Sequence, residues 1–217
     1  MPTKRVFFDL DGTLTDPKEG IVRSIQYALR KMRQDEPPES ALVKYIGPPL
    51  RETFAELLGQ QDGVEEAIRL YRERFSTIGL FENTVYPDVV ELLENLQAQG
   101  WLLYVVTAKP MPYALRIVEH FRLLQYFQNI YGSELDGRFD KKTELIGHVL
   151  KTENLQKEHV VMVGDREHDV KAARAHGIAA VGVTYGYGSR EELSEAGAHW
   201  ICDSPGDLYT VLLEYFC

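Results

Sequence analysis

The chain has 217 residues, of which 44% are hydrophobic and 26% are charged, so its composition excludes a disordered or fibrous protein. Its 24 Lys and Arg residues against 33 Asp and Glu residues give a net charge of −9. This charge argues against a nucleic-acid polymer or a membrane as the main partner, because both are anionic. Its two cysteines suit a reducing compartment, and no apolar run resembles a signal peptide or a membrane span. We therefore expect a cytoplasmic monomer or homodimer that acts on a small molecule.

The first predicted element is a β-strand at residues 5–10, where an apolar run ends in acidic residues. The next part of the chain, residues 16–83, contains no convincing strand. Its apolar residues recur at helical spacing, as at Ile21, Ile25, Ala28, Leu29 and Met32, and predict helices at 19–33, 40–45, 50–58 and 64–78. We therefore expect a helical domain that is inserted after the first strand.

From residue 84 to residue 217, short apolar runs alternate with helical patterns. The predicted strands are 102–107, 128–131, 160–164, 178–183 and 199–202, and the predicted helices are 87–99, 110–121, 142–152, 169–176, 190–196 and 207–216. Near-continuous apolar strands are typical of a parallel sheet that is buried on both faces. The alternation predicts an α/β fold, a Rossmann-like doubly wound parallel sheet formed by residues 1–15 and 84–217.

Three of these strands run into polar side chains. The first ends in Asp9-Leu-Asp-Gly-Thr13, the strand at 102–107 ends in Thr107-Ala-Lys109, and the strand at 160–164 continues into Gly164-Asp-Arg-Glu-His-Asp169. Ligand sites of open α/β sheets lie at the carboxyl ends of the strands, so we expect these groups to face one crevice. Crowded carboxylates require a cation, and oxygen ligands without Cys or His favour Mg²⁺.

Phosphoryl transfer would use each of these groups. A carboxylate beside Mg²⁺ can attack phosphorus, and a second carboxyl two residues later can act first as an acid and then as a base. A lysine and a threonine can bind the non-bridging oxygens. Gly12 permits a sharp turn through which backbone N–H groups can approach the phosphoryl group.

These motifs together resemble the haloacid dehalogenase superfamily. The segment Asp9-Leu-Asp-Gly-Thr-Leu-Thr15 is similar to its first motif, Thr107 to the second, Lys142 to the third, and Gly164-Asp165 with Asp169 to the fourth. The insertion at 16–83 resembles the helical cap of this superfamily. Segments such as Gly47-Pro-Pro-Leu50 are similar to the phosphoglycolate phosphatase-like branch, some of whose members are 5′-nucleotidases.

The resemblance implies a role for each matching residue. Asp9 would be the nucleophile and Asp11 the general acid and base. The carboxylates of Asp9 and Asp165 and the carbonyl of Asp11 would bind Mg²⁺. Asp169 would either contact these ligands without binding the ion or bind the ion through a water molecule. The predicted phosphate-binding residues are Gly12, Thr13, Thr107, Ala108 and Lys142, of which Lys142 is also catalytic through its pairing with Asp9. Lys142 fits the family spacing better than Lys141 does.

The resemblance therefore implies a Mg²⁺-dependent phosphatase that hydrolyses small phosphate monoesters, of the phosphoglycolate or nucleoside monophosphate class. An acid/base at Asp11 favours a phosphatase over a dehalogenase. Lys109, Arg23 and Arg51 are candidate substrate-binding residues. The tyrosines of Tyr185-Gly-Tyr187 are interpreted as loop packing in preference to stacking on a base. Two alternatives stay open: a phosphomutase similar to β-phosphoglucomutase, and a non-enzymatic switch phosphorylated on aspartate.

Overall fold

The computed structural model describes residues 3–215 and divides into two compact units. One unit comprises Met1–Thr15 and Val85–Cys217, and the other comprises Asp16–Thr84. Residue 216, the predicted end of the last helix, and Cys217 lie outside the described residues. No helix in residues 3–215 has both the length and the apolar character needed to cross a bilayer.

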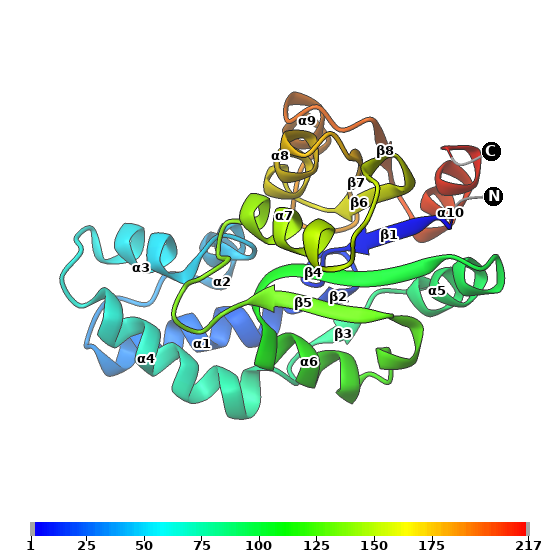
Figure 1. Ribbon diagram of the computed structural model, residues 1–217. Helices are drawn as coiled ribbons and strands as arrows, with labels where there is room; N and C mark the ends of the chain where they lie inside the picture. Colours follow the sequence, from blue (N-terminus) through cyan, green and yellow to red (C-terminus); the bar gives the residue numbers. More distant parts are fainter. Residues whose placement is uncertain (1–2, 216–217) are drawn as a thin grey trace. The chain divides into compact units, whose positions relative to one another are not determined.

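The first unit contains a six-stranded parallel sheet (Figure 1). Its strands, in spatial order, are β5 (Asn129–Ser133), β4 (Leu102–Pro110), β1 (Arg5–Phe8), β6 (Val160–Gly164), β7 (Ala179–Val183) and β8 (Trp200–Cys202). The chain moves outward from β1 through β4 to β5 and then returns to β6 on the opposite side of β1. The strand β1 therefore lies at the topological switch point, where open α/β sheets bind ligands. The prediction of a doubly wound parallel α/β fold is confirmed.

Helices cover both faces of this sheet. They are α5 (Val89–Ala98), α6 (Met111–His120), α7 (Lys142–Thr152), α8 (Glu167–Ala175), α9 (Arg190–Glu195) and α10 (Pro205–Tyr215). Figure 1 shows α7, α8 and α9 on one side of the sheet and α5 and α6 on the other. On the side of α7, a buried core joins strand residues such as Phe7 and Met162 to helix residues such as Ile146 and Val170. Burial on both faces explains why the strand sequences are almost continuously apolar.

The second unit is built from helices. They are α1 (Lys18–Lys31), α2 (Glu39–Leu42), α3 (Leu50–Leu58) and α4 (Val64–Arg74), with a 3-10 turn at Val43–Tyr45 and a π-helical turn at Phe75–Gly79. In α1 the residues Ile21, Ile25, Ala28 and Leu29 are buried, as their helical spacing predicts, whereas Met32 is partly exposed after the helix end. The predicted helix 64–78 corresponds to α4 and the π-helical turn that follows it directly.

Two short strands were not predicted from the sequence. These are β2 (Thr15–Asp16) and β3 (Thr84–Val85), which pair with each other. They are the segments through which the chain leaves the α/β unit and returns to it. Strands of two residues carry no periodic signal, because period-2 alternation needs several residues to be recognised.

Candidate active site

The carboxyl end of β1 places Asp9 in the middle of the sheet edge. The backbone N–H of Asp9 donates to the Val163 carbonyl at 2.9 Å, so the residue continues the pairing of β1 with β6. The Asp9 side chain is buried, and its Oδ1 lies 2.9 Å from Nζ of Lys142. The nucleophile predicted from the sequence thus follows the end of β1 and faces the buried ammonium group of Lys142.

The turn that follows Asp9 depends on a glycine. Gly12 has a φ of +80°, and its N–H donates to the carbonyl of Thr15 at 2.8 Å. A Cβ atom at this position would lie 2.2 Å from Oδ2 of Asp165. A side chain at this position would therefore strain the backbone and collide with Asp165.

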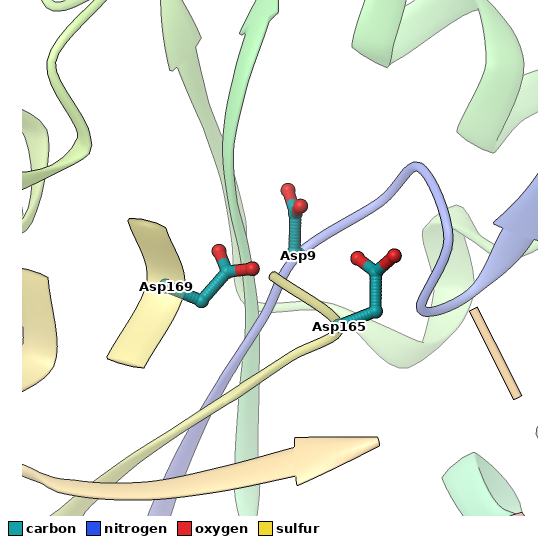
Figure 2. Close-up of side chains that lie close together, drawn as sticks. All are labelled: Asp9, Asp165 and Asp169. Carbon is teal, nitrogen blue, oxygen red and sulfur yellow. The ribbon is translucent and has the colours of Figure 1, made fainter. Parts of the chain in front are cut away.

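Three buried aspartates gather beside this turn. Ligand atoms of Asp9, Asp165 and Asp169 all lie within 4.8 Å of one another, and Figure 2 shows their carboxyl groups close together. Burial raises the pKa of Asp165 well above its usual range, and the charges of Asp169 and Asp9 raise it further. Such a set of hard oxygen donors fits a divalent cation such as Mg²⁺, whose charge would favour the ionised carboxylates. The Asp11 carbonyl as a further ligand stays a prediction.

Lys142 lies at the start of α7 and joins two of these carboxylates. Its Nζ pairs with Asp9 and donates a hydrogen bond to Oδ1 of Asp169. Burial alone would lower the pKa of Lys142, but the charges of Asp169 and Asp9 outweigh it and raise the pKa. The other oxygen of Asp169, Oδ2, accepts from the Arg166 N–H at 3.1 Å. Asp169 therefore fixes the Lys142 ammonium beside Asp9, whereas neighbouring Lys141 is exposed.

Asp11 has a cationic partner of its own. Nζ of Lys109 lies 2.7 Å from Oδ2 of Asp11, and the two side chains are only 6% and 13% exposed. Oδ1 of Asp11 is buried and has no hydrogen-bond partner among the described residues. Burial raises the pKa of Asp11, although the Lys109 ammonium acts against this and lowers it. Lys109, a candidate substrate ligand in the sequence, thus contacts the predicted acid/base residue directly.

Besides Lys142, the predicted phosphate-binding residues come from the ends of two strands, β1 and β4. The register of β4 with β5 shifts between Val106 and Pro110, so Thr107 and Ala108 lie in an irregular stretch of a strand that is longer than predicted. Such a bulge re-aims side chains next to active sites. Thr107 is buried, and its Oγ1 accepts from the Lys109 N–H at 3.2 Å. Thr13 on the β1 turn donates from Oγ1 to Oδ1 of Asp165 at 3.4 Å.

The two candidate substrate arginines belong to the helical unit. Arg23 pairs there with Glu19 and Glu82, and Arg51 pairs with Glu65. Both arginine side chains are more than half exposed. Glutamates of the same unit thus offset the charges of both arginines. A part of either arginine in substrate binding stays a prediction.

One group of contacts was missed by the sequence analysis. The backbone N–H of Tyr187 donates to Oδ2 of Asp165 at 2.8 Å, and the hydroxyl of Tyr185 donates to the Thr13 carbonyl at 3.1 Å. The sequence pattern favours loop packing over base stacking for these tyrosines and does not predict either hydrogen bond. The alternating glycines of Gly186-Tyr-Gly188 could have indicated close backbone approach, because glycine is the residue that permits it.

Comparison with known proteins identifies the family. The model of the family described as haloacid dehalogenase-like hydrolase matches residues 6–183. The chain belongs to this family. The match spans β1 through β7 and includes every strand end described above. The resemblance inferred from the sequence motifs is confirmed, and the chain is a hydrolase of the haloacid dehalogenase-like type.

The chain is similar over most of its length to several known proteins. A 5′-nucleotidase from Pseudomonas aeruginosa is 48% identical over 91% of this chain and 90% of its own length. The crystal structure of a predicted phosphatase from Clostridium acetobutylicum has a TM-score of 0.94 and 41% identity, covering 99% of this chain and all of that one. Tyrosine-protein kinase PtkA from Mycobacterium tuberculosis is 41% identical over 84% of this chain, which spans only 62% of that protein.

Proposed function

We propose that this protein is a Mg²⁺-dependent phosphatase that hydrolyses small phosphate monoesters through a phospho-aspartate on Asp9. The observation that carries the proposal is the placement of Asp9 between a buried lysine and two further aspartates at the switch point of the sheet. The similarity to a 5′-nucleotidase makes nucleoside 5′-monophosphates the first substrate class to test, beside phosphoglycolate.

In the first half-reaction, a carboxylate oxygen of Asp9 attacks phosphorus and the bond to the leaving alcohol breaks. Lys142 is held 2.9 Å from Asp9 and offsets negative charge where the phosphoryl group binds. When bound, Mg²⁺ would add a second positive charge that stabilises the phosphoryl oxygens. The Thr107 hydroxyl is suited to donate to the same oxygens, whereas the Gly12 N–H already donates to the Thr15 carbonyl.

Asp11 would move the protons. In its protonated form it donates to the leaving alcohol oxygen, and the resulting carboxylate then accepts a proton from the water that attacks the phospho-aspartate. Hydrolysis releases inorganic phosphate and restores both aspartates. Burial supports the first role, because it raises the pKa of Asp11 and so favours the protonated form. Its unpartnered Oδ1 leaves one oxygen for these transfers.

A phosphate-release screen tests this proposal. Nucleoside monophosphates, phosphoglycolate and sugar phosphates are compared by kcat/KM in the presence of Mg²⁺. We expect sustained turnover on at least one class, loss of activity with EDTA, and recovery when Mg²⁺ is restored. No phosphate release from any of these esters would contradict the proposal. Isomerisation of a hexose 1-phosphate without free phosphate would indicate a phosphomutase, and a single phosphorylation without turnover would indicate a switch.

The similarity to PtkA raises a second candidate, transfer of a phosphoryl group to tyrosine. The match covers 62% of the length of that protein. The two activities are separated by incubation with ATP and Mg²⁺. Phosphotyrosine formed on the chain or on an added peptide would favour the kinase, and its absence alongside phosphate release from monoesters would favour the phosphatase.

The pairing of Lys109 with Asp11 predicts the behaviour of a Lys109→Met variant. We expect kcat/KM to fall about tenfold, because Asp11 loses the partner that orients it. Lys109 lowers the pKa of Asp11, so its removal raises that pKa. Protonated Asp11 then persists to higher pH, and the alkaline fall of kcat/KM should move to higher pH. The measurement is a pH–rate profile.

Lys109→Arg is the matched control, because it keeps the positive charge beside Asp11. It should retain a profile near that of the wild type. If Lys109→Met also keeps the wild-type profile and rate, Lys109 does not control the Asp11 proton.

A further inference from the structure

A short segment after β7 packs directly against the proposed cation site. Its residues 185–188 lie beside the Gly12 turn and beside Asp165. A Cβ atom at Gly186 would lie 2.2 Å from the Gly12 carbonyl oxygen and 2.5 Å from Cβ of Asp165. A Cβ atom at Gly188 would lie 1.9 Å from the backbone oxygen of Asp165. Three chain segments therefore meet at distances that only glycine permits.

Hydrogen bonds join the same three segments. The Tyr185 hydroxyl donates to the Thr13 carbonyl at 3.1 Å, which ties the segment to the turn after Asp9. The N–H of Tyr187 donates to Oδ2 of Asp165 at 2.8 Å, and the Thr13 hydroxyl reaches its Oδ1. Tyr187 thus holds one carboxylate oxygen of Asp165 and Thr13 holds the other. The hydrogen bond from the Tyr185 hydroxyl joins the segments that contain these two residues. The Tyr185 ring itself is supported by Tyr86, with ring centroids 5.3 Å apart and planes at 64°.

We propose that Tyr185 is a positioning residue for the cation site, which orients Asp165 by tying residues 185–188 to the turn at Thr13. This inference rests on the proposed function, because it assumes that Asp165 is a cation ligand. Its physical reason is that a carboxylate ligand binds an ion well only when its own hydrogen bonds fix its orientation. Tyr185 contributes through Thr13 and the Tyr187 N–H and need not touch the ion or the substrate.

The test is a Tyr185→Phe variant, which keeps the aromatic ring against Tyr86 and removes only the hydroxyl. Mg²⁺ is titrated into wild type and variant by calorimetry without substrate. We expect the Mg²⁺ affinity to fall about tenfold, as is typical when an outer partner of a metal ligand is lost. The Mg²⁺ concentration for half-maximal phosphate release should rise in parallel, while kcat at saturating Mg²⁺ changes less than about twofold. Tyr209→Phe, on α10, is the matched control and should bind Mg²⁺ like the wild type.

The outcomes separate this inference from the proposed function. A merely structural hydroxyl would lower the midpoint of thermal unfolding without Mg²⁺ and leave the Mg²⁺ affinity unchanged, and this result would overturn the inference alone. A wild-type chain that binds no Mg²⁺ would overturn the cation site and the inference together. Weaker Mg²⁺ binding by Tyr185→Phe, with wild-type binding by Tyr209→Phe, would support it.

Discussion

An Asp9→Asn variant should lose at least about 1,000-fold in kcat, because the amide oxygen of Asn cannot replace the carboxylate as a nucleophile. The substitution preserves the size of the side chain. It also removes one negative charge from the group of three aspartates, so it relieves repulsion with Asp165 and leaves Lys142 paired with Asp169. We therefore expect the thermal unfolding midpoint to stay close to that of the wild type. Phosphate release and thermal unfolding measure the two effects.

Asp62→Asn provides the matched control for this variant. Asp62 is exposed in the helical unit, and the same chemical change there should leave kcat unaltered. A folded Asp9→Asn variant with a rate close to that of the wild type would show that Asp9 is not the nucleophile.

A Lys142→Met variant should lose both activity and stability. Lys142 is buried and pairs with Asp9 and Asp169, so its removal leaves two carboxylates buried without their cation. Breaking a buried ion pair in this way costs about 3 kcal/mol or more in the free energy of unfolding. We expect kcat/KM to fall at least about 100-fold, because the charge that stabilises the transition state at Asp9 is lost. Urea unfolding and phosphate-release kinetics measure these effects.

The adjacent lysine supplies the control. Lys141 is exposed, so Lys141→Met should change the free energy of unfolding by less than about 0.5 kcal/mol and leave kcat/KM unchanged. A double variant with Lys142→Met and Asp169→Asn should regain part of the lost stability, because one uncompensated charge is removed. Equal effects at Lys141 and Lys142 would contradict the assignment of the third motif to Lys142.

The strands of the α/β unit were predictable because local sequence reports burial. Runs such as Val160–Gly164 are apolar on both faces only where helices cover both sides of a sheet. The length of β4 was not predictable, since its last residues, through Lys109 and Pro110, are polar or unusual in a strand. The register shift beside Thr107 arises from pairing with β5, and pairing is a contact between distant segments.

The family, the α/β fold and the aspartates at the strand ends could be predicted from the linear sequence, because short motifs and local periodicities carry those signals. The family resemblance also predicted Lys142 beside Asp9, but the other partners of the buried lysines appear only in three dimensions. Lys109 pairs with Asp11 and Lys142 with Asp9 and Asp169. The contacts of Tyr185 with Thr13 likewise join residues that are 172 positions apart. Such pairings depend on the order and register of strands in space, and a charge or a glycine in a linear pattern does not specify its partner.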